Sequence, residues 1–248
     1  MSGHSKWSTI KRKKGAKDAR KSKIWARIAR DIMVAAKDGG GDQGMNPHLA
    51  VAIEKAKSEN MPKDNIERAI KRGTGEIEGA DYVEISYEGY ASSGIAVFVE
   101  ALTDNTYRTV ADVRSIMSKA GGSLGQNGSV AYLFSRKGVF DVPAAGVDES
   151  RLFEVVADAG AEDLELSGDQ FIVTCEVEAF GSVQSALEKA GISVEEASLQ
   201  RVPLSTNSLD IDAARKITQL IEKLEDHPDV QAVYTNLEFD DALMAELS

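Results

Sequence analysis

The sequence predicts an α+β protein, with a small N-terminal helical domain followed by two two-layer α/β domains, one inserted in the other. Two observations support this prediction. Apolar residues recur with a helical period up to about residue 75 and with the alternating period of strands after residue 79. The strands and helices expected near residues 80–135 and 206–248 also flank a third stretch, residues 136–205, which contains all the elements of one α/β unit.

The N-terminal domain is predicted to contain three short amphipathic helices. The first covers residues 18–38, with apolar side chains on one arc and cations on the opposite arc. The second begins at Asn46, an N-cap residue followed by Pro47 in the first turn. The third begins near Pro62 and ends at Gly73. The apolar arc of the first helix consists of Ile24, Trp25, Ile28, Ala29, Ile32 and Met33.

The next part of the chain is predicted to form an incomplete sheet. Its strands are expected at 82–87, 95–102 and 130–134, with a helix at 106–120 and a loop at 121–128. Near the C-terminus, a helix at 210–226 and a strand at 230–237 have no partners of their own. We therefore expect these two elements to complete the sheet left open earlier in the chain.

The stretch between them has the element order βαββαβ, which is typical of the ferredoxin-like unit. Its strands are expected at 138–142, 162–167, 170–176 and 194–202, and its helices at 148–159 and 179–190. The predicted domains are therefore residues 1–79, residues 80–135 together with 206–248, and the inserted residues 136–205.

Charge is distributed very unevenly along the chain. The first 37 residues carry twelve Lys or Arg against two acids, and residues 1–73 carry eighteen against eight, a net of +10. The remaining residues hold 29 − 18 = 11 basic and 40 − 8 = 32 acidic side chains, a net of −21. Such polarity indicates a polyanionic partner at the N-terminal end.

Several functional classes are disfavoured by composition. The three histidines, His4, His48 and His227, show no metal-ligand spacing, and the lone Cys175 predicts a buried structural thiol. Neither glycine run, 39–44 or 121–128, has the context of a phosphate-binding loop. No apolar stretch approaches the roughly 20 residues needed to cross a bilayer. We therefore expect a cytoplasmic protein without enzymatic activity, cofactor, metal, small-molecule substrate or membrane.

The first 37 residues, called the basic segment below, contain the candidate nucleic-acid-binding site. Residues 1–17 lack apolar periodicity, and Trp7 supplies an aromatic ring that could stack on an unpaired base or anchor the segment. Cations that neutralise phosphates release counterions, which drives binding. The candidate residues are Lys6, Trp7, Lys11, Arg12, Lys13, Lys14, Lys17, Arg20, Lys23, Arg27 and Arg30.

Several motifs, in order along nearly the whole chain, resemble the YebC family. They are Gly3-His4-Ser5-Lys6-Trp7, Gly39-Gly40-Gly41-Asp42, Asn46-Pro47, Arg68-Ala69-Ile70-Lys71-Arg72-Gly73, Tyr87-Glu88-Gly89-Tyr90, Gly128-Ser129-Val130-Ala131-Tyr132-Leu133-Phe134, Gly160-Ala161-Glu162-Asp163 and Lys223-Leu224-Glu225-Asp226.

The resemblance implies a three-domain cytoplasmic protein without enzymatic activity. Bacterial members are usually described as DNA-binding transcriptional regulators. A mitochondrial relative activates translation of a cytochrome oxidase subunit, and bacterial relatives are linked to ribosomes stalled at proline-rich stretches. The family often has two basic-flanked positions in the Thr-Asp-Asn-x-x-Arg-Thr loop, whereas Arg108 is the one cation of that loop here. We expect Asn105 or Thr106 to cap the helix that follows.

Three kinds of function remain open from the sequence. One is a transcriptional regulator that binds DNA, and the second is a translation factor that binds rRNA or tRNA on the ribosome. Proteins of the transcription machinery or of the ribosome are further candidate partners. The third is a protein-interaction module without nucleic acid, which would leave the basic segment unexplained. Polyphosphate binding alone does not distinguish DNA from RNA.

Overall fold

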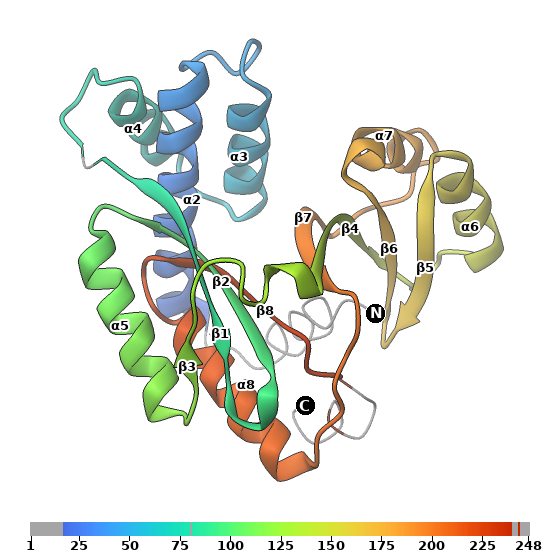
Figure 1. Ribbon diagram of the computed structural model, residues 1–248. Coiled ribbons are helices and arrows are strands. Elements are labelled where there is room, and N and C mark those ends of the chain that lie inside the picture. The colour runs from blue at the N-terminus through green and yellow to red at the C-terminus, as the bar shows by residue number, and fades with distance from the viewer. Residues whose placement is uncertain (1–16, 80, 240–242, 244–248) are drawn as a thin grey trace.

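The computed structural model describes residues 17–79, 81–239 and 243, with side chains from residue 23 onward. Three helices precede two four-stranded antiparallel sheets, each covered by helices (Figure 1). This is the α+β architecture that the sequence predicts. The exact domain boundaries remain a prediction.

The three N-terminal helices are α2 (Lys17–Gly39), α3 (Pro47–Ser58) and α4 (Lys63–Gly73). Asn46 caps α3, as predicted, because its side-chain oxygen accepts the N–H of Leu49 at 3.0 Å. Its amide also donates to the carbonyl oxygens of Ala35 and Gly40, so one buried side chain ties the end of α2 to the start of α3. The core of these helices consists of Ile28, Ile32, Ala36, Leu49, Ile53, Ala56, Met61, Ile66 and Ala69.

Sheet one has the strand order β3-β1-β2-β8 and is assembled from two separate parts of the chain. Apolar side chains from α5 and α8 pack against one face of this sheet. As expected, the C-terminal helix and strand complete the sheet that the earlier segment leaves open. Its elements are β1 (Val83–Tyr90), β2 (Ala96–Thr103), α5 (Thr106–Lys119), β3 (Ser123–Leu124), α8 (Ile211–Glu225) and β8 (Val230–Thr235).

Sheet two has the order β5-β6-β4-β7 and the predicted βαββαβ element order. Phe140 is fully buried beneath the helices and stacks on Phe180 with 4.7 Å between ring centroids. Cys175 is a buried thiol in the same core, as predicted. The elements are β4 (Phe134–Pro143), α6 (Glu149–Asp158), β5 (Ala161–Ser167), β6 (Gln170–Glu176), α7 (Phe180–Lys189) and β7 (Glu196–Pro203).

The strand expected at 130–134 is wrong. Residues Ala131–Leu133 form a 3-10 helix, and β4 begins only at Phe134. The buried carboxylate of Glu88 accepts three backbone N–H groups, from Gly128, Val130 and Ala131, at 2.7–2.8 Å. Because these N–H groups turn toward one side chain, they do not take part in a strand ladder.

The loop expected at 121–128 contains a strand that the sequence pattern missed. Ser123 and Leu124 form β3, which pairs with Tyr90 and Gly89 of β1. A Cβ atom at Gly89 would lie 2.2 Å from the carbonyl oxygen of Ser123. Glycine at this position therefore allows the two backbones to approach, and β1 continues to Tyr90.

Candidate nucleic-acid interface

The candidate residues of the basic segment fall into three groups. Lys6, Trp7, Lys11, Arg12, Lys13 and Lys14 lie outside the described residues. Lys17 and Arg20 lie on α2, where the backbone alone is described. Lys23, Arg27 and Arg30 follow on the same helix, and their side chains are described.

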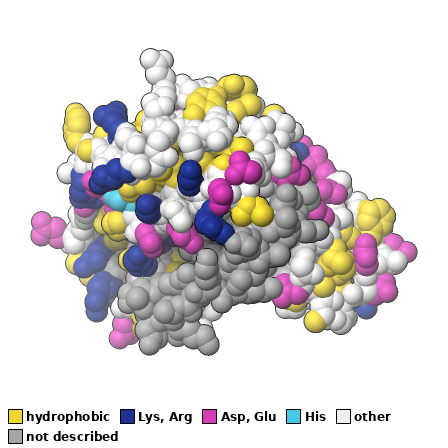
Figure 2. All heavy atoms as spheres, turned by 90° about the horizontal axis from the view of Figure 1, so that it is seen from below, with side chains coloured by type: hydrophobic (Ala, Val, Ile, Leu, Met, Phe, Trp, Pro, Cys, Tyr) yellow, Lys and Arg dark blue, Asp and Glu magenta, His cyan; other side chains and the backbone are white. Residues whose placement is uncertain are grey.

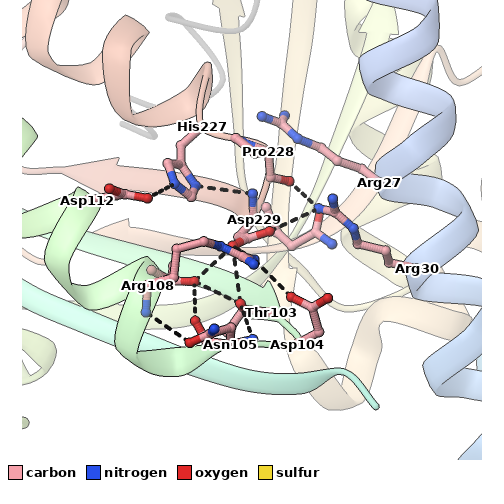
Figure 3. A network of polar contacts seen from close by, with 12 residues as sticks. Arg27, Arg30, Thr103, Asp104, Asn105, Arg108, Asp112, His227, Pro228 and Asp229 are labelled. Carbon is pink, nitrogen blue, oxygen red and sulfur yellow. Dashed lines mark hydrogen bonds and ion pairs between the residues drawn. The ribbon is translucent and has the colours of Figure 1, made fainter. Parts of the chain in front are cut away.

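Three of the four α2 cations with described side chains contact the end of α8 and the turn that leads into β8, whereas the fourth, Lys37, pairs with Asp81. Lys23 Nζ lies 2.9 Å from a carboxylate oxygen of Asp226. Arg27 donates to the carbonyl oxygen of Glu225, and Arg30 donates to that of Pro228. Figure 3 shows Arg27 and Arg30 reaching from α2 toward this turn. The basic arc of the helix is thus turned toward the protein's own C-terminal segment, about 200 residues away in sequence.

Asp229 is the centre of this contact. Its buried carboxylate accepts hydrogen bonds from Arg108 Nη2 at 2.7 Å and Thr109 Oγ1 at 2.8 Å, and Thr103 Oγ1 lies at 3.1 Å (Figure 3). Arg30 Nη1 lies 3.8 Å from the other oxygen. One carboxylate therefore connects β2, α5, the start of β8 and the N-terminal helix α2.

The charge of Asp229 is stabilised within this network. Burial opposes ionisation, but the hydrogen bonds from Arg108, Thr109 and Thr103 outweigh it and lower the pKa of Asp229 below its ordinary value. A group with a lowered folded-state pKa stabilises the fold above its unfolded pKa, and this stabilisation is lost as the pH falls through the folded value. At neutral pH the network holds an ionised carboxylate between two arginines.

Arg108 and His227 have structural partners at this turn. Arg108 pairs with Asp104 at 2.8 Å as well as with Asp229, and Asn105 caps α5 by accepting the N–H of Arg108, as expected. His227 Nδ1 accepts the N–H of Asp229 at 3.2 Å, and its Nε2 lies 3.3 Å from Asp112. Both side chains hold the end of α8 against α5.

Sequence reasoning missed a groove between α2 and α4. It has a volume of about 280 Å³, and its rim carries Arg68 and Arg72, two exposed cations of α4. Trp25 lines the groove and is half-buried, with its indole N–H donating to the carbonyl oxygen of Glu59 at 3.0 Å. The helical spacing of Arg68, Lys71 and Arg72 was the available signal, because these positions lie outside the apolar stripe of α4.

The described residues contain no group of three or more His, Cys, Asp or Glu side chains that could hold a metal ion. Within the same part of the chain, no helix is both long and apolar enough to cross a membrane. The chemistry available at the α8–β8 turn is ion pairing and hydrogen bonding.

Two family models match almost the whole chain. The model described as the TACO1/YebC protein N-terminal domain matches residues 5–76, and the model of the TACO1/YebC second and third domain matches residues 82–237. The chain belongs to the TACO1/YebC family. The N-terminal match includes most of the basic segment as well as the three helices.

Other members of the TACO1/YebC family resemble this chain over its full length. A probable transcriptional regulatory protein of Rubrobacter xylanophilus is 55% identical over 249 residues, covering 100% of both chains. One of Chlorobaculum tepidum is 50% identical, covering 100% of this chain and 99% of the relative. The crystal structure of a conserved hypothetical protein from Aquifex aeolicus has a TM-score of 0.84 and 44% identity, covering 90% of this chain and 93% of that one.

Proposed function

We propose that the chain is a non-enzymatic regulator of gene expression that binds nucleic acid through its basic N-terminal segment. The observation that carries this proposal is the charge separation between residues 1–73, at +10, and the rest of the chain, at −21. The positive part attracts a phosphate backbone, whereas the negative part repels it, so the polyanion is directed to one end of the molecule. The protein is expected to act in the cytoplasm without a cofactor.

DNA is the first candidate ligand. The relatives from Rubrobacter xylanophilus and Chlorobaculum tepidum are named as probable transcriptional regulatory proteins, which supports a role in transcription. In this role the cations from Lys6 to Arg20 would neutralise phosphates. Arg27 and Arg30, which contact Glu225 and Pro228, would fix the orientation of α2.

RNA on the ribosome is the second candidate ligand. The docking of Arg27 and Arg30 onto the α8–β8 turn disfavours α2 as a helix that reads the major groove, because these side chains are engaged within the protein. A basic segment containing Trp7 suits irregular RNA with unpaired bases. Under this reading, ribosomal proteins are further partners, in place of proteins of the transcription machinery.

The proposal is tested by reversing the charge of the cationic run. Lys11, Arg12, Lys13 and Lys14 are replaced together by Glu, and affinity for a 30-base-pair DNA duplex and for a 30-nucleotide RNA is measured against salt concentration. Each lost phosphate contact reduces the slope of log K against log salt by about 0.9 on duplex DNA and about 0.7 on a single strand. We expect weaker binding with a flatter slope.

The matched control places the same charge change elsewhere. Lys55 and Lys57 on α3, Arg151 on α6 and Lys189 on α7 are exposed and are replaced together by Glu. The control should retain the wild-type slope. An unchanged slope in the Lys11–Lys14 variant would contradict the proposed phosphate contacts. Sucrose-gradient sedimentation of lysate with and without RNase then separates the ligands, because RNase-sensitive co-migration with ribosomal particles favours RNA.

A further inference from the structure

The acidic part of the chain, residues 74–248, has few cations, and these are concentrated on two neighbouring helices. Residues 74–248 contain 11 basic side chains, and six of them lie on α5 and α8. Figure 2 shows dark blue side chains gathered over one side of the molecule, whereas acidic side chains are frequent at the opposite end, where sheet two lies. The six cations are Arg108, Arg114, Lys119, Arg215, Lys216 and Lys223.

The two helices form one continuous outer layer. They pack beside each other over sheet one, and His227 at the end of α8 contacts Asp112 of α5. The start of α5 and the end of α8 lie at the same end of the sheet, because Val230 of β8 pairs with Ala101 of β2. The helices therefore run antiparallel, and both turn their exposed sides away from the sheet.

Four of these cations form no ion pair within the described part of the chain. Arg114, Lys119, Lys216 and Lys223 are exposed and form no ion pair with another residue of the described part. Lys216 and Lys223 are seven residues apart, which places them two turns apart on one side of α8. Exposed cations that have no ion-pair partner in the protein are available to an anionic ligand.

An exposed aromatic ring lies on the side of α5 that carries Arg114. Tyr107 is 87% exposed and lies seven residues before Arg114, on the same side of α5. A ring left almost wholly in water contributes nothing to the core of sheet one. Aromatic rings beside cations are the pattern with which proteins hold single-stranded nucleic acid, because a base stacks on the ring while the backbone contacts the charges.

This surface adjoins α2. Lys23 of α2 contacts Asp226, the residue that caps the end of α8. The chain enters α2 at Lys17, six residues and about 9 Å of helix before Lys23. The start of α2 therefore lies near the end of α8 that carries Lys223. The 14 residues of α5 span about 21 Å, which is long enough to follow several successive phosphates.

We propose that Tyr107, Arg114, Lys119, Lys216 and Lys223, the α5–α8 face, form a second contact surface for single-stranded nucleic acid. This inference rests on the proposed function, and it adds a ligand class and a second surface to it. The cations of the α5–α8 face contact the phosphates of the strand, and Tyr107 stacks on an unpaired base. Sheet two, in contrast, takes no part in binding.

The test neutralises this face in the full-length chain. Lys119, Lys216 and Lys223 are replaced together by Gln, and the control replaces Lys55, Lys57 and Lys189 by Gln. Binding of a 30-nucleotide oligo(U) is measured from low to high salt. Loss of three contacts should flatten the slope of log K against log salt by about 2, and the control should keep the wild-type slope.

Tyr107→Ala separates stacking from charge. We expect about tenfold weaker binding of oligo(U) with an unchanged salt slope, because a base loses its stacking partner while the cations remain. Binding of a 30-base-pair duplex should change little, because its bases are already paired and stacked. Unfolding of each variant by urea confirms that an altered surface, rather than a lost fold, causes the effect.

The outcomes separate this inference from the proposed function. If the triple variant and Tyr107→Ala bind like wild type while the Lys11–Lys14 variant does not, the α5–α8 face is not a binding surface and the proposed function stands. If the triple variant loses binding and the Lys11–Lys14 variant does not, the face is supported and the basic segment fails. If wild type binds neither oligo(U) nor duplex, both proposals are overturned.

Discussion

Sheet one and sheet two are built alike but carry different surfaces and different connections. Each has four antiparallel strands with two helices over one face. The helices of sheet one carry six cations, whereas α6 and α7 carry two, Arg151 and Lys189. Sheet one also holds α2 through Asp229 and contacts sheet two through Arg201, which pairs with Glu100 at 2.8 Å. Sheet one thus joins the N-terminal helices to sheet two, whereas sheet two is an appended unit of the same architecture.

The first test of this contrast removes a fully buried ring from the core of sheet two. Phe140→Ala leaves a cavity beside Phe180 and should destabilise sheet two by about 4 kcal/mol. Hydrogen exchange measured by mass spectrometry should show faster exchange across β4–β7. Because sheet two is an appended unit, exchange in β1, β2 and β8 should remain near wild type.

The matched variant is Phe98→Ala in β2, whose ring packs edge-on against Phe134 and lies 3.9 Å below the Arg201 guanidinium. Its loss should accelerate exchange in sheet one and also at the junction with sheet two. If both variants accelerate hydrogen exchange in both sheets to the same extent, the two sheets unfold together. The distinction between sheet one as a junction and sheet two as an appended unit would then be wrong.

The second test removes the carboxylate that joins sheet one to α2. Asp229→Ala removes the buried carboxylate that accepts from Arg108, Thr109 and Thr103, and leaves Arg108 with Asp104 as its remaining carboxylate partner. This loss should lower the free energy of unfolding by about 3 kcal/mol. Urea unfolding measures this as a lower midpoint. Asp158→Ala, an exposed carboxylate at the end of α6, is the control and should change the midpoint little. A similar urea midpoint for both variants would show that the Asp229 carboxylate contributes little to the stability of the fold.

The third test concerns Asp31 on α2, which lies in a cleft of about 400 Å³ together with Glu84, Arg136 and Arg201. Burial raises the pKa of Asp31 to about 6, and Gln231 Nε2 donates to its carboxylate at 3.0 Å. The folded state therefore holds the proton more tightly than the unfolded state. The stabilisation is complete below the unfolded pKa of 3.8 and is lost as the pH rises through about 6.

Asp31→Asn keeps this side chain neutral at every pH. The variant should match wild type near pH 4 and exceed it by about 2 kcal/mol above pH 7, after allowance for partial solvent exposure. Thermal unfolding followed from pH 4 to pH 8 measures the difference, with Asp38→Asn on the exposed end of α2 as the control. A constant difference across this range would contradict the raised pKa.

Periodicity was sufficient to predict most elements. The apolar spacing of Ile28 and Ile32, or of Leu152 and Val156, places one face of each helix in a core, and the structure confirms both. The interval 121–134 was predicted incorrectly because distant groups shape it. Glu88 gathers the N–H groups of residues 128–131, and Gly89 admits β3. No local pattern contains the position of a carboxylate forty residues earlier in the chain.

The candidate site was predictable in composition but not in its contacts. The count of cations before Gly73 requires no structure, and it remains the support for polyanion binding. The contacts of Arg27 and Arg30 depend on Glu225 and Pro228, which lie 198 residues further along the chain. Likewise, the cations of α5 and α8 are scattered in sequence between residues 108 and 223. They lie on neighbouring helices only because β8 pairs with β2.

The sequence by itself therefore determined the order of most helices and strands, the buried face of most of them and the separation of charge along the chain. These properties follow from side-chain periodicity and from simple counts, both of which are local. Tertiary structure alone decided which cations of α2 bind the protein itself and which exposed cations share a face. Those outcomes depend on a strand and a carboxylate from the other end of the chain, because β8 and Asp229 bring α2, α5 and α8 together at one edge of sheet one.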